Sequence, residues 1–206
     1  MEYYDLIIVG AGPAGLSLTR ELAKSNLKIL VLDKKNNAEN VSYNTSGSYL
    51  NPQNSDLPSD IFHPIEQVYF ASKNESFVKK VKGSIINRKK LLTFFEKESI
   101  KNKNLKIKYN STIKEVKVSE NGIDYLVYFD SVSENKVSAK IFADCSGVSA
   151  ILGRKLEIST VKPTLAVGAE YLVPLIKHPQ TVDLFTGSNL RGGTVGFFRK
   201  TQKRRL

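Results

Sequence analysis

The fold is decided by the stretch Asp5-Leu6-Ile7-Ile8-Val9-Gly10-Ala11-Gly12-Pro13-Ala14-Gly15, near the start of a chain of 206 residues. After Asp5 comes a short apolar run, Leu6 to Val9, so the first five residues predict a buried strand of a parallel sheet. Three glycines follow at once, and Ala14, Leu18 and Leu22 then recur every four residues, which predicts a helix with one packed face. Lys28 to Leu32 predicts a second strand, so the segment forms a βαβ unit.

The three glycines have the spacing G-x-G-x-x-G between a predicted strand and a predicted helix, which is the context of a dinucleotide-binding turn. Gly10 permits the tight turn, Gly12 lets a pyrophosphate approach the backbone, and Gly15 lets the helix pack close to the strand. The N-terminus of the helix presents free N–H groups and the positive end of its dipole to phosphates. We therefore predict a dinucleotide site at this turn.

Asp33 ends the second predicted strand, eighteen residues after Gly15. A carboxylate at this place can accept hydrogen bonds from the hydroxyls of an adenosine ribose, and its charge opposes a 2′-phosphate, so NADP is disfavoured. A solvated aspartate in a turn is the simpler alternative. FAD and NAD both bind to this fold, and the residues themselves leave that choice open.

Three stretches together resemble two-dinucleotide-type flavoproteins and, within them, the geranylgeranyl reductase family. Residues 4–15 resemble the N-terminal start, residues 86–92 (INRKKLL) the R-x-x-L/F helix start, and residues 143–149 (ADCSGVS) the A-D-G-x-x-S strand end. The resemblance covers about residues 4 to 160, and the larger group includes aromatic-ring flavin hydroxylases. It implies FAD as the cofactor. The chain departs from the family at Asp144-Cys145, because the glycine that usually follows the aspartate is delayed to Gly147.

The resemblance also implies contacts to the cofactor, residue by residue. The pyrophosphate would be lined by Gly10, Ala11, Gly12, Pro13, Ala14 and Gly15, and the adenosine ribose would be held by Asp33 with Lys34 beside it. Toward the rest of the cofactor, the expected contacts are Ser46 and Gly47 at the flavin, Arg88 at the phosphates or ribityl chain, the backbone of Thr112 and Ile113 at the adenine, and Asp144 and Gly147 near the flavin phosphates. Neither a metal site nor a catalytic residue is predicted.

The remaining sequence predicts a longer series of elements. These are a long loop over 36–60, short strands and turns over 61–86, a helix over 91–100 after Asn87, a hairpin of residues 112–119 and 123–129 around Asn121-Gly122, and an apolar strand over 137–143. After residue 160, the segments 164–173, 181–186 and 193–199 predict antiparallel strands. Residues 168–171 and 191–198 resemble strands of the family's substrate domain.

These elements predict an α/β fold. Residues 1–160 would form a Rossmann-like FAD-binding domain, a parallel sheet with a β-meander, with an inserted loop or substrate segment at about 45–86. Residues 161–206 would form the start of an antiparallel substrate-domain sheet and a basic tail. The family's third flavin motif, a Gly-Asp before a helix, is absent from the sequence. A fragment of a longer enzyme, a truncated or frameshifted gene, and a fold completed by a second polypeptide all remain open.

Composition sets the broad class of the protein. The net charge is +11, which indicates a lysine-rich solvated surface or attraction to anionic lipid, and no nucleic-acid motif accompanies it. No apolar run reaches the ~20 residues of a membrane span, and no signal peptide precedes the first strand, so we expect a cytoplasmic protein. Cys145 is the only cysteine, which excludes an internal disulfide, and His63 and His178 are isolated from other catalytic residue types.

The resemblance implies an FAD-dependent oxidoreductase that reduces carbon–carbon double bonds of isoprenoid lipids. A flavin-dependent monooxygenase of small aromatics shares every motif, and a truncated, non-catalytic nucleotide-binding protein is the third hypothesis. The expected partners are a small-molecule or lipid substrate and an unidentified electron donor, without nucleic acid. We also expect peripheral association with a membrane, and self-association or a partner subunit through the incomplete sheet, whose open strand edges favour pairing.

Overall fold

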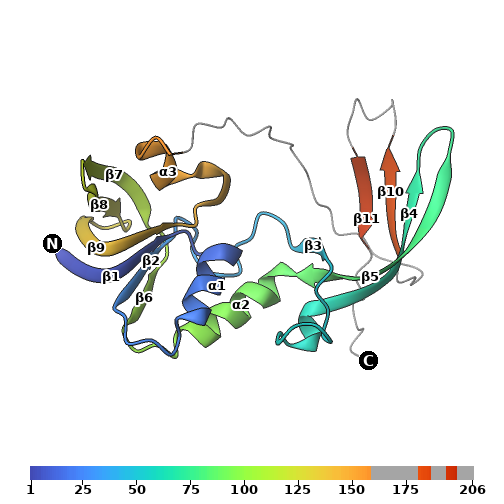
Figure 1. Ribbon diagram of the computed structural model, residues 1–206, viewed down its shortest axis with the longest axis horizontal. Coiled ribbons are helices and arrows are strands. Elements are labelled where there is room, and N and C mark those ends of the chain that lie inside the picture. Colours follow the sequence, from blue (N-terminus) through green and yellow to red (C-terminus); the bar gives the residue numbers. More distant parts are fainter. Residues whose placement is uncertain (159–180, 187–193, 199–206) are drawn as a thin grey trace. The chain divides into compact units, whose positions relative to one another are not determined.

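A computed structural model describes residues 1–158, 181–186 and 194–198 of the chain, which divides into two units. The first unit joins residues 1–41 to 89–167, and the second joins residues 42–88 to 168–206. The expected insertion at about 45–86 therefore corresponds to the 42–88 part of the second unit, together with the segment that follows residue 167. Figure 1 shows the described helices and strands in chain order.

The first unit is built on a six-stranded sheet in the order β6-β2-β1-β9-β8-β7. Its strands are β1 (Glu2–Val9), β2 (Ile29–Leu32), β6 (Leu105–Lys108), β7 (Thr112–Ser119), β8 (Gly122–Phe129) and β9 (Glu134–Asp144). Strands β6, β2, β1 and β9 run parallel, and β7, β8 and β9 form an antiparallel meander. The predicted Rossmann-like α/β fold is confirmed, whereas β6 was not predicted, because four residues at a sheet edge give too short a pattern.

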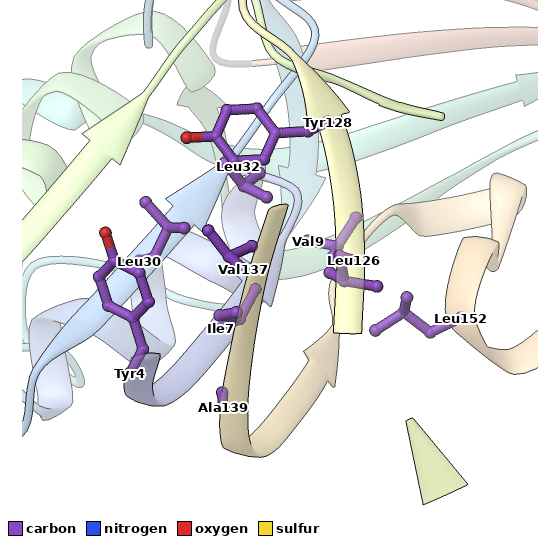
Figure 2. Packing of buried hydrophobic residues seen from close by; sticks show 10 residues of the cluster. All are labelled: Tyr4, Ile7, Val9, Leu30, Leu32, Leu126, Tyr128, Val137, Ala139 and Leu152. Atoms are coloured by element: carbon purple, nitrogen blue, oxygen red, sulfur yellow. The ribbon is translucent and has the colours of Figure 1, made fainter. Parts of the chain in front are cut away.

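The core of this unit lies on one face of the sheet, where side chains of the parallel strands meet those of the meander (Figure 2). Ile7 and Val9 alternate toward this face and pack with Leu126 and Tyr128 of β8. The full set of buried members is Tyr4, Ile7, Val9, Leu30, Leu32, Leu126, Tyr128, Val137, Ala139 and Leu152. The last of these belongs to α3 (Ile151–Lys155), which thereby packs against the sheet.

Two helices, α1 (Pro13–Glu21) and α2 (Arg88–Ser99), complete the first unit beside the sheet (Figure 1). The two helices contact each other through buried hydroxyl groups. Thr19 Oγ1 of α1 lies 2.7 Å from Ser99 Oγ of α2, within hydrogen-bonding distance. The helix predicted over 91–100 is confirmed, and it begins earlier, at Arg88 directly after Asn87.

The second unit contains a five-stranded sheet in the order β11-β10-β4-β5-β3. Its strands are β3 (Thr45–Ser48), β4 (Phe62–Ala71), β5 (Ser76–Asn87), β10 (Thr181–Thr186) and β11 (Thr194–Phe198), and a short 3₁₀ turn, η1 (Ser59–Ile61), precedes β4. Strands β10 and β11 pair antiparallel, as predicted for residues 181–186 and 193–199, whereas β10 pairs parallel with β4, so the second sheet as a whole is mixed. The parallel pairing joins segments more than a hundred residues apart, which no local pattern reveals.

Two other expectations for this unit are corrected. Residues 61–86 form one long hairpin of β4 and β5 instead of short strands, and β3 lies inside the expected loop over 36–60. Strand β3 has the sequence TSGS, without apolar alternation, so pairing with β5 alone defines it.

The strand predicted over 164–173, the family-like residues 168–171 and 191–193, and His178 lie outside the described residues. In the described part of the chain, no helix combines the length and the apolar character that crossing a membrane requires.

Candidate cofactor site

The first glycine of the loop forms a tight turn from β1 toward α1, against the end of β9. Gly10 has φ +108°, a conformation that side-chain-bearing residues rarely adopt, and a Cβ on it would lie 2.2 Å from the carbonyl oxygen of Cys145. The backbone is held on both sides, since Gly10 N–H donates to Leu32 O and Cys145 N–H donates to Val9 O. Only glycine fits this position, as the sequence predicts.

The second glycine leaves open space at the N-terminus of α1. A Cβ built on Gly12 would meet nothing within 4 Å, and Gly12 has φ −78°, which any residue tolerates. Gly12 is the N-cap of α1, Pro13 follows without an N–H, and the first turn contains no acidic residue. The N–H groups and positive dipole end at this terminus are therefore not neutralised by the helix's own first turn.

Asp33 holds the loop from the end of β2. Its Oδ2 accepts a hydrogen bond of 2.6 Å from Ala11 N–H, and its Oδ1 accepts one of 2.9 Å from Lys35 N–H. The Lys35 ammonium in turn donates to Ala11 O at 2.7 Å, so the backbone N–H and the backbone carbonyl of Ala11 are both bonded to this segment. A carboxylate has about four lone-pair sites, which leaves Asp33 capacity to accept bonds from ribose hydroxyls.

Lys35, which the sequence did not indicate, contacts the glycine loop, while the assignment of Lys34 to the ribose stays a prediction. The side chain of Lys34 is exposed, whereas Lys35 turns back to the glycine loop. No periodic signal indicated Lys35, because the chain bends at residues 34–37, where Lys35 N–H donates to Asp33 Oδ1.

Thr112 and Ile113 begin β7 next to the Asp33 segment. The two residues before them are hydrogen-bonded to it, since Ser111 N–H donates to Asp33 O and Asn110 N–H donates to Lys35 O. The structure therefore brings Thr112 close to the strand end at which the ribose contact is predicted.

Asp144 caps a helix in this structure. Its Oδ1 accepts bonds from the N–H and the hydroxyl of Ser146, and its Oδ2 accepts bonds from Leu152 N–H at 2.8 Å and Gly153 N–H at 2.9 Å, in the first turn of α3. Burial alone would raise the pKa of the Asp144 carboxyl, but these hydrogen bonds outweigh it and hold the pKa below its ordinary value. Four donors occupy its lone pairs, so a bond to a ribityl hydroxyl would have to replace one of them.

The residues between Asp144 and α3 form the rest of this turn. Gly147, in the short 3₁₀ turn η2 (Gly147–Ser149), has φ +66°, and a Cβ on it would meet nothing within 4 Å. Glycine is needed here for the backbone conformation.

Burial raises the pKa of the Cys145 thiol and the Asp144 charge adds to the shift, so this cysteine is held as the unreactive thiol.

Arg88 belongs to a separate cluster in the second unit. Its guanidinium carbon lies 4.1 Å from the centre of the Tyr43 ring, and its Nη1 donates to Tyr43 Oη at 2.9 Å and to Ser46 Oγ at 3.4 Å. Its buried Nε has no hydrogen-bond partner. Ser46 and Gly47 both lie in β3, so the structure groups three predicted site residues and adds Tyr43, which no sequence pattern indicated.

The first unit fits the ADP half of a dinucleotide. The open space at Gly12 lies at a helix N-terminus that favours anions, and the Asp33 carboxylate lies at the adjoining strand end. The donors and the acceptor thus have the polarity that a pyrophosphate and a ribose require.

Comparison with protein families places the site in a known context. Residues 7–140 match the pyridine nucleotide-disulphide oxidoreductase family. This match begins within β1 and ends within β9, and therefore includes the glycine loop, Asp33 and Lys35.

Solved structures of similar fold include a geranylgeranyl bacteriochlorophyll reductase-like protein from Thermoplasma acidophilum, with 18% identity, a TM-score of 0.71, and 91% of this chain and 51% of that chain covered. A mutant of PqsL from Pseudomonas aeruginosa has 15% sequence identity and a TM-score of 0.72, and the match covers 96% of this chain and 58% of PqsL. A mutant of the halogenase PltM, solved in complex with FAD, has 19% sequence identity and a TM-score of 0.58, and the match covers 75% of this chain and 36% of PltM. At these identities the likeness concerns the fold, and the chain spans about half the length of the first two structures.

Proposed function

This chain belongs to the pyridine nucleotide-disulphide oxidoreductase family, and on that premise we propose that it is an FAD-dependent oxidoreductase of the geranylgeranyl reductase type, acting on carbon–carbon double bonds of an isoprenoid lipid. The observation that carries the dinucleotide site is the open space at Gly12 beside the Asp33 carboxylate, and the choice of FAD is supported by the family resemblance and by the halogenase PltM, a structure of similar fold solved with FAD. The reductase assignment is supported by the three family-like stretches and by the fold shared with the Thermoplasma acidophilum protein.

The residues of this chain bind and orient the cofactor. The Gly10–Gly15 loop and the first turn of α1 donate N–H groups to the pyrophosphate, and Asp33 accepts from the ribose hydroxyls. Lys35 fixes the loop through Ala11 O and adds a positive charge next to it. When bound, FAD supplies the hydride-transfer chemistry.

The remaining assignments follow the family resemblance. Arg88, with Ser46 and Gly47, is assigned to the phosphates or ribityl chain, Thr112 and Ile113 to the adenine, and Asp144 and Gly147 to the region of the flavin phosphates. A guanidinium suits such a role, because it is permanently charged and donates in a fixed fork. The unpartnered Nε of Arg88 has a donor to offer.

The visible spectrum of the purified chain tests the cofactor. We expect flavin absorption, or uptake of added FAD followed by quenching of its fluorescence. Binding of NAD or ADP without FAD would overturn the assignment and favour a non-catalytic nucleotide-binding protein.

Product analysis separates the reductase from the second candidate, a flavin-dependent monooxygenase. That candidate is favoured by the similarity in fold to PqsL, which is described as a probable FAD-dependent monooxygenase. With chemically reduced FAD and a geranylgeranyl lipid under nitrogen, we expect a mass gain of two hydrogens for each double bond reduced. Oxygen consumption with hydroxylation of a small aromatic, and no lipid reduction, would instead establish the monooxygenase.

A further inference from the structure

The outer face of the β4–β5 hairpin carries apolar side chains that solvent reaches. Side chains alternate along each strand except at one register shift in β4, between Ile65 and Gln67. As a result, one face of the sheet carries the packed cluster of Ile65, Val68, Val81, Ile85, Val182 and Leu184. Tyr69, Val78 and Phe185 therefore point to the other face, where Val78 is 55% and Phe185 38% exposed. The Tyr69 and Phe185 rings meet edge to face at 6.1 Å, so these apolar groups form a continuous surface.

Positive charge borders the same face. Lys80 and Lys82 follow Val78 at spacings of two along β5, so they share its face, and both are exposed. Strand β5 contains three lysines and no acidic residue. Within the described ranges, neither Lys80 nor Lys82 forms an ion pair. Asp183 of β10, opposite Tyr69, is an acid on this face, and exposed Glu66 of β4 lies at the register shift across from Lys82. We call Tyr69, Val78, Lys80, Lys82 and Phe185 the outer patch.

We propose that the outer patch docks onto an anionic membrane surface. Apolar side chains next to lysines combine the two attractions that hold proteins at such surfaces, burial at the acyl boundary and attraction to headgroup phosphates. Lysine stems also cover apolar surface while their ammonium groups reach the headgroups. A tyrosine with a partly buried ring suits the same boundary.

The positive charge of the outer patch favours an anionic membrane over a second copy of the chain as its binding partner. Two outer patches brought face to face would oppose lysine to lysine, and each chain has a net charge of +11. An anionic lipid layer has the complementary charge. This inference goes beyond the proposed function, because none of the outer-patch residues is assigned to FAD.

Vesicle binding of the 206-residue chain tests the proposal, and neighbouring residues on the two faces of β5 provide matched variants. The probes are vesicles of phosphatidylcholine alone and of phosphatidylcholine mixed with phosphatidylglycerol. We expect binding to the mixed vesicles only, weakening as salt screens the charges. Each lysine near the surface contributes about fivefold, so Lys80→Glu/Lys82→Glu should weaken binding by more than about tenfold. Val78→Ser should also weaken it.

The controls are Lys79→Glu and Phe77→Ser, whose side chains lie on the opposite face. Phe77 is 59% exposed and stacks on Phe70, so it offers as much apolar surface as Val78. These variants should bind vesicles nearly as well as the unchanged chain, and circular dichroism should show the same fold for all four. Equal losses from both faces, or no binding to anionic vesicles by the unchanged chain, would overturn the proposal. A concentration-dependent dimer that Val78→Ser abolishes, without vesicle binding, would assign the patch to a second copy.

Discussion

Gly15 in α1 packs so closely on Gly10 that a Cβ on Gly15 would lie 1.9 Å from the Gly10 carbonyl oxygen. The same added carbon would lie 3.3 Å from Cγ2 of Ile8, which places the helix directly against β1. Gly12, between the two, has no such neighbour. The three glycines of one motif therefore serve two different purposes, close packing at Gly10 and Gly15 and open space at Gly12.

Gly15→Ala and Gly12→Ala should separate these purposes. Gly15→Ala forces α1 away from the strand and should lower the free energy of unfolding by about 3 kcal/mol. Gly12→Ala should lower it by less than about 1 kcal/mol, because its backbone is in an ordinary conformation, yet abolish FAD uptake, because the methyl group fills the space for the pyrophosphate. Urea unfolding and FAD titration measure the two effects. Normal FAD binding by a folded Gly12→Ala protein would contradict the proposed site.

Lys35→Met should weaken FAD binding, and Lys34→Met should not. The first variant removes the bond from the ammonium to Ala11 O, which we expect to reduce affinity by about fivefold, equivalent to about 1 kcal/mol. Lys34 is exposed, and the structure shows no bond from it to the loop. Fluorescence titration with FAD gives both dissociation constants. An equal loss of FAD affinity in both variants would indicate that positive charge in general, and not the bond from Lys35 to Ala11 O, favours FAD binding.

Arg88→Met should raise the dissociation constant of FAD by about tenfold, if its guanidinium makes a charge-assisted bond to the ligand. The loss of the Tyr43 contact should cost the second unit some stability as well. The control is Lys97→Met, which removes an exposed positive charge from the last turn of the same helix. Unchanged FAD affinity in Arg88→Met would leave Arg88 with a structural role at Tyr43 and Ser46.

The sequence predicts some of these features well and others poorly, for physical reasons. The glycine loop and Asp33 were predictable, because backbone conformation and close packing demand particular residues there. Strand β3 and the parallel pairing of β10 with β4 were not, because both arise from partners distant in the chain. The helix cap formed by Asp144 was not predicted either, because it depends on where α3 begins. The contact of Arg88 with Tyr43 joins residues 45 positions apart, with β3, β4 and β5 between them, so no periodic pattern indicates it.

Asp144→Asn should make the free energy of unfolding less dependent on pH under acidic conditions. The folded-state pKa of Asp144 lies below its ordinary value, so its carboxylate stabilises the fold above the unfolded-state pKa of about 3.9, and this contribution disappears as the pH falls through the lower folded-state value. At neutral pH the variant should lose about 1 kcal/mol, as for other helix caps. Urea unfolding near neutrality and below pH ~3 compares the two proteins. A difference that persists undiminished in acid would show that the charge is unimportant.

Thr19 and Ser99 allow a double-mutant cycle on the contact between α1 and α2. Thr19→Val should cost about 1 kcal/mol, because Ser99 Oγ loses a buried partner, and Ser99→Ala should cost a similar amount. Each hydroxyl keeps a second contact within its own helix, Thr19 to Leu16 O and Ser99 to Phe95 O. The double variant removes both polar groups together, so it should cost less than the sum of the single changes, with a coupling energy of about 1 kcal/mol measured by urea unfolding. Strict additivity would mean that the two hydroxyls act separately, and that apolar packing alone joins the helices beside the glycine loop.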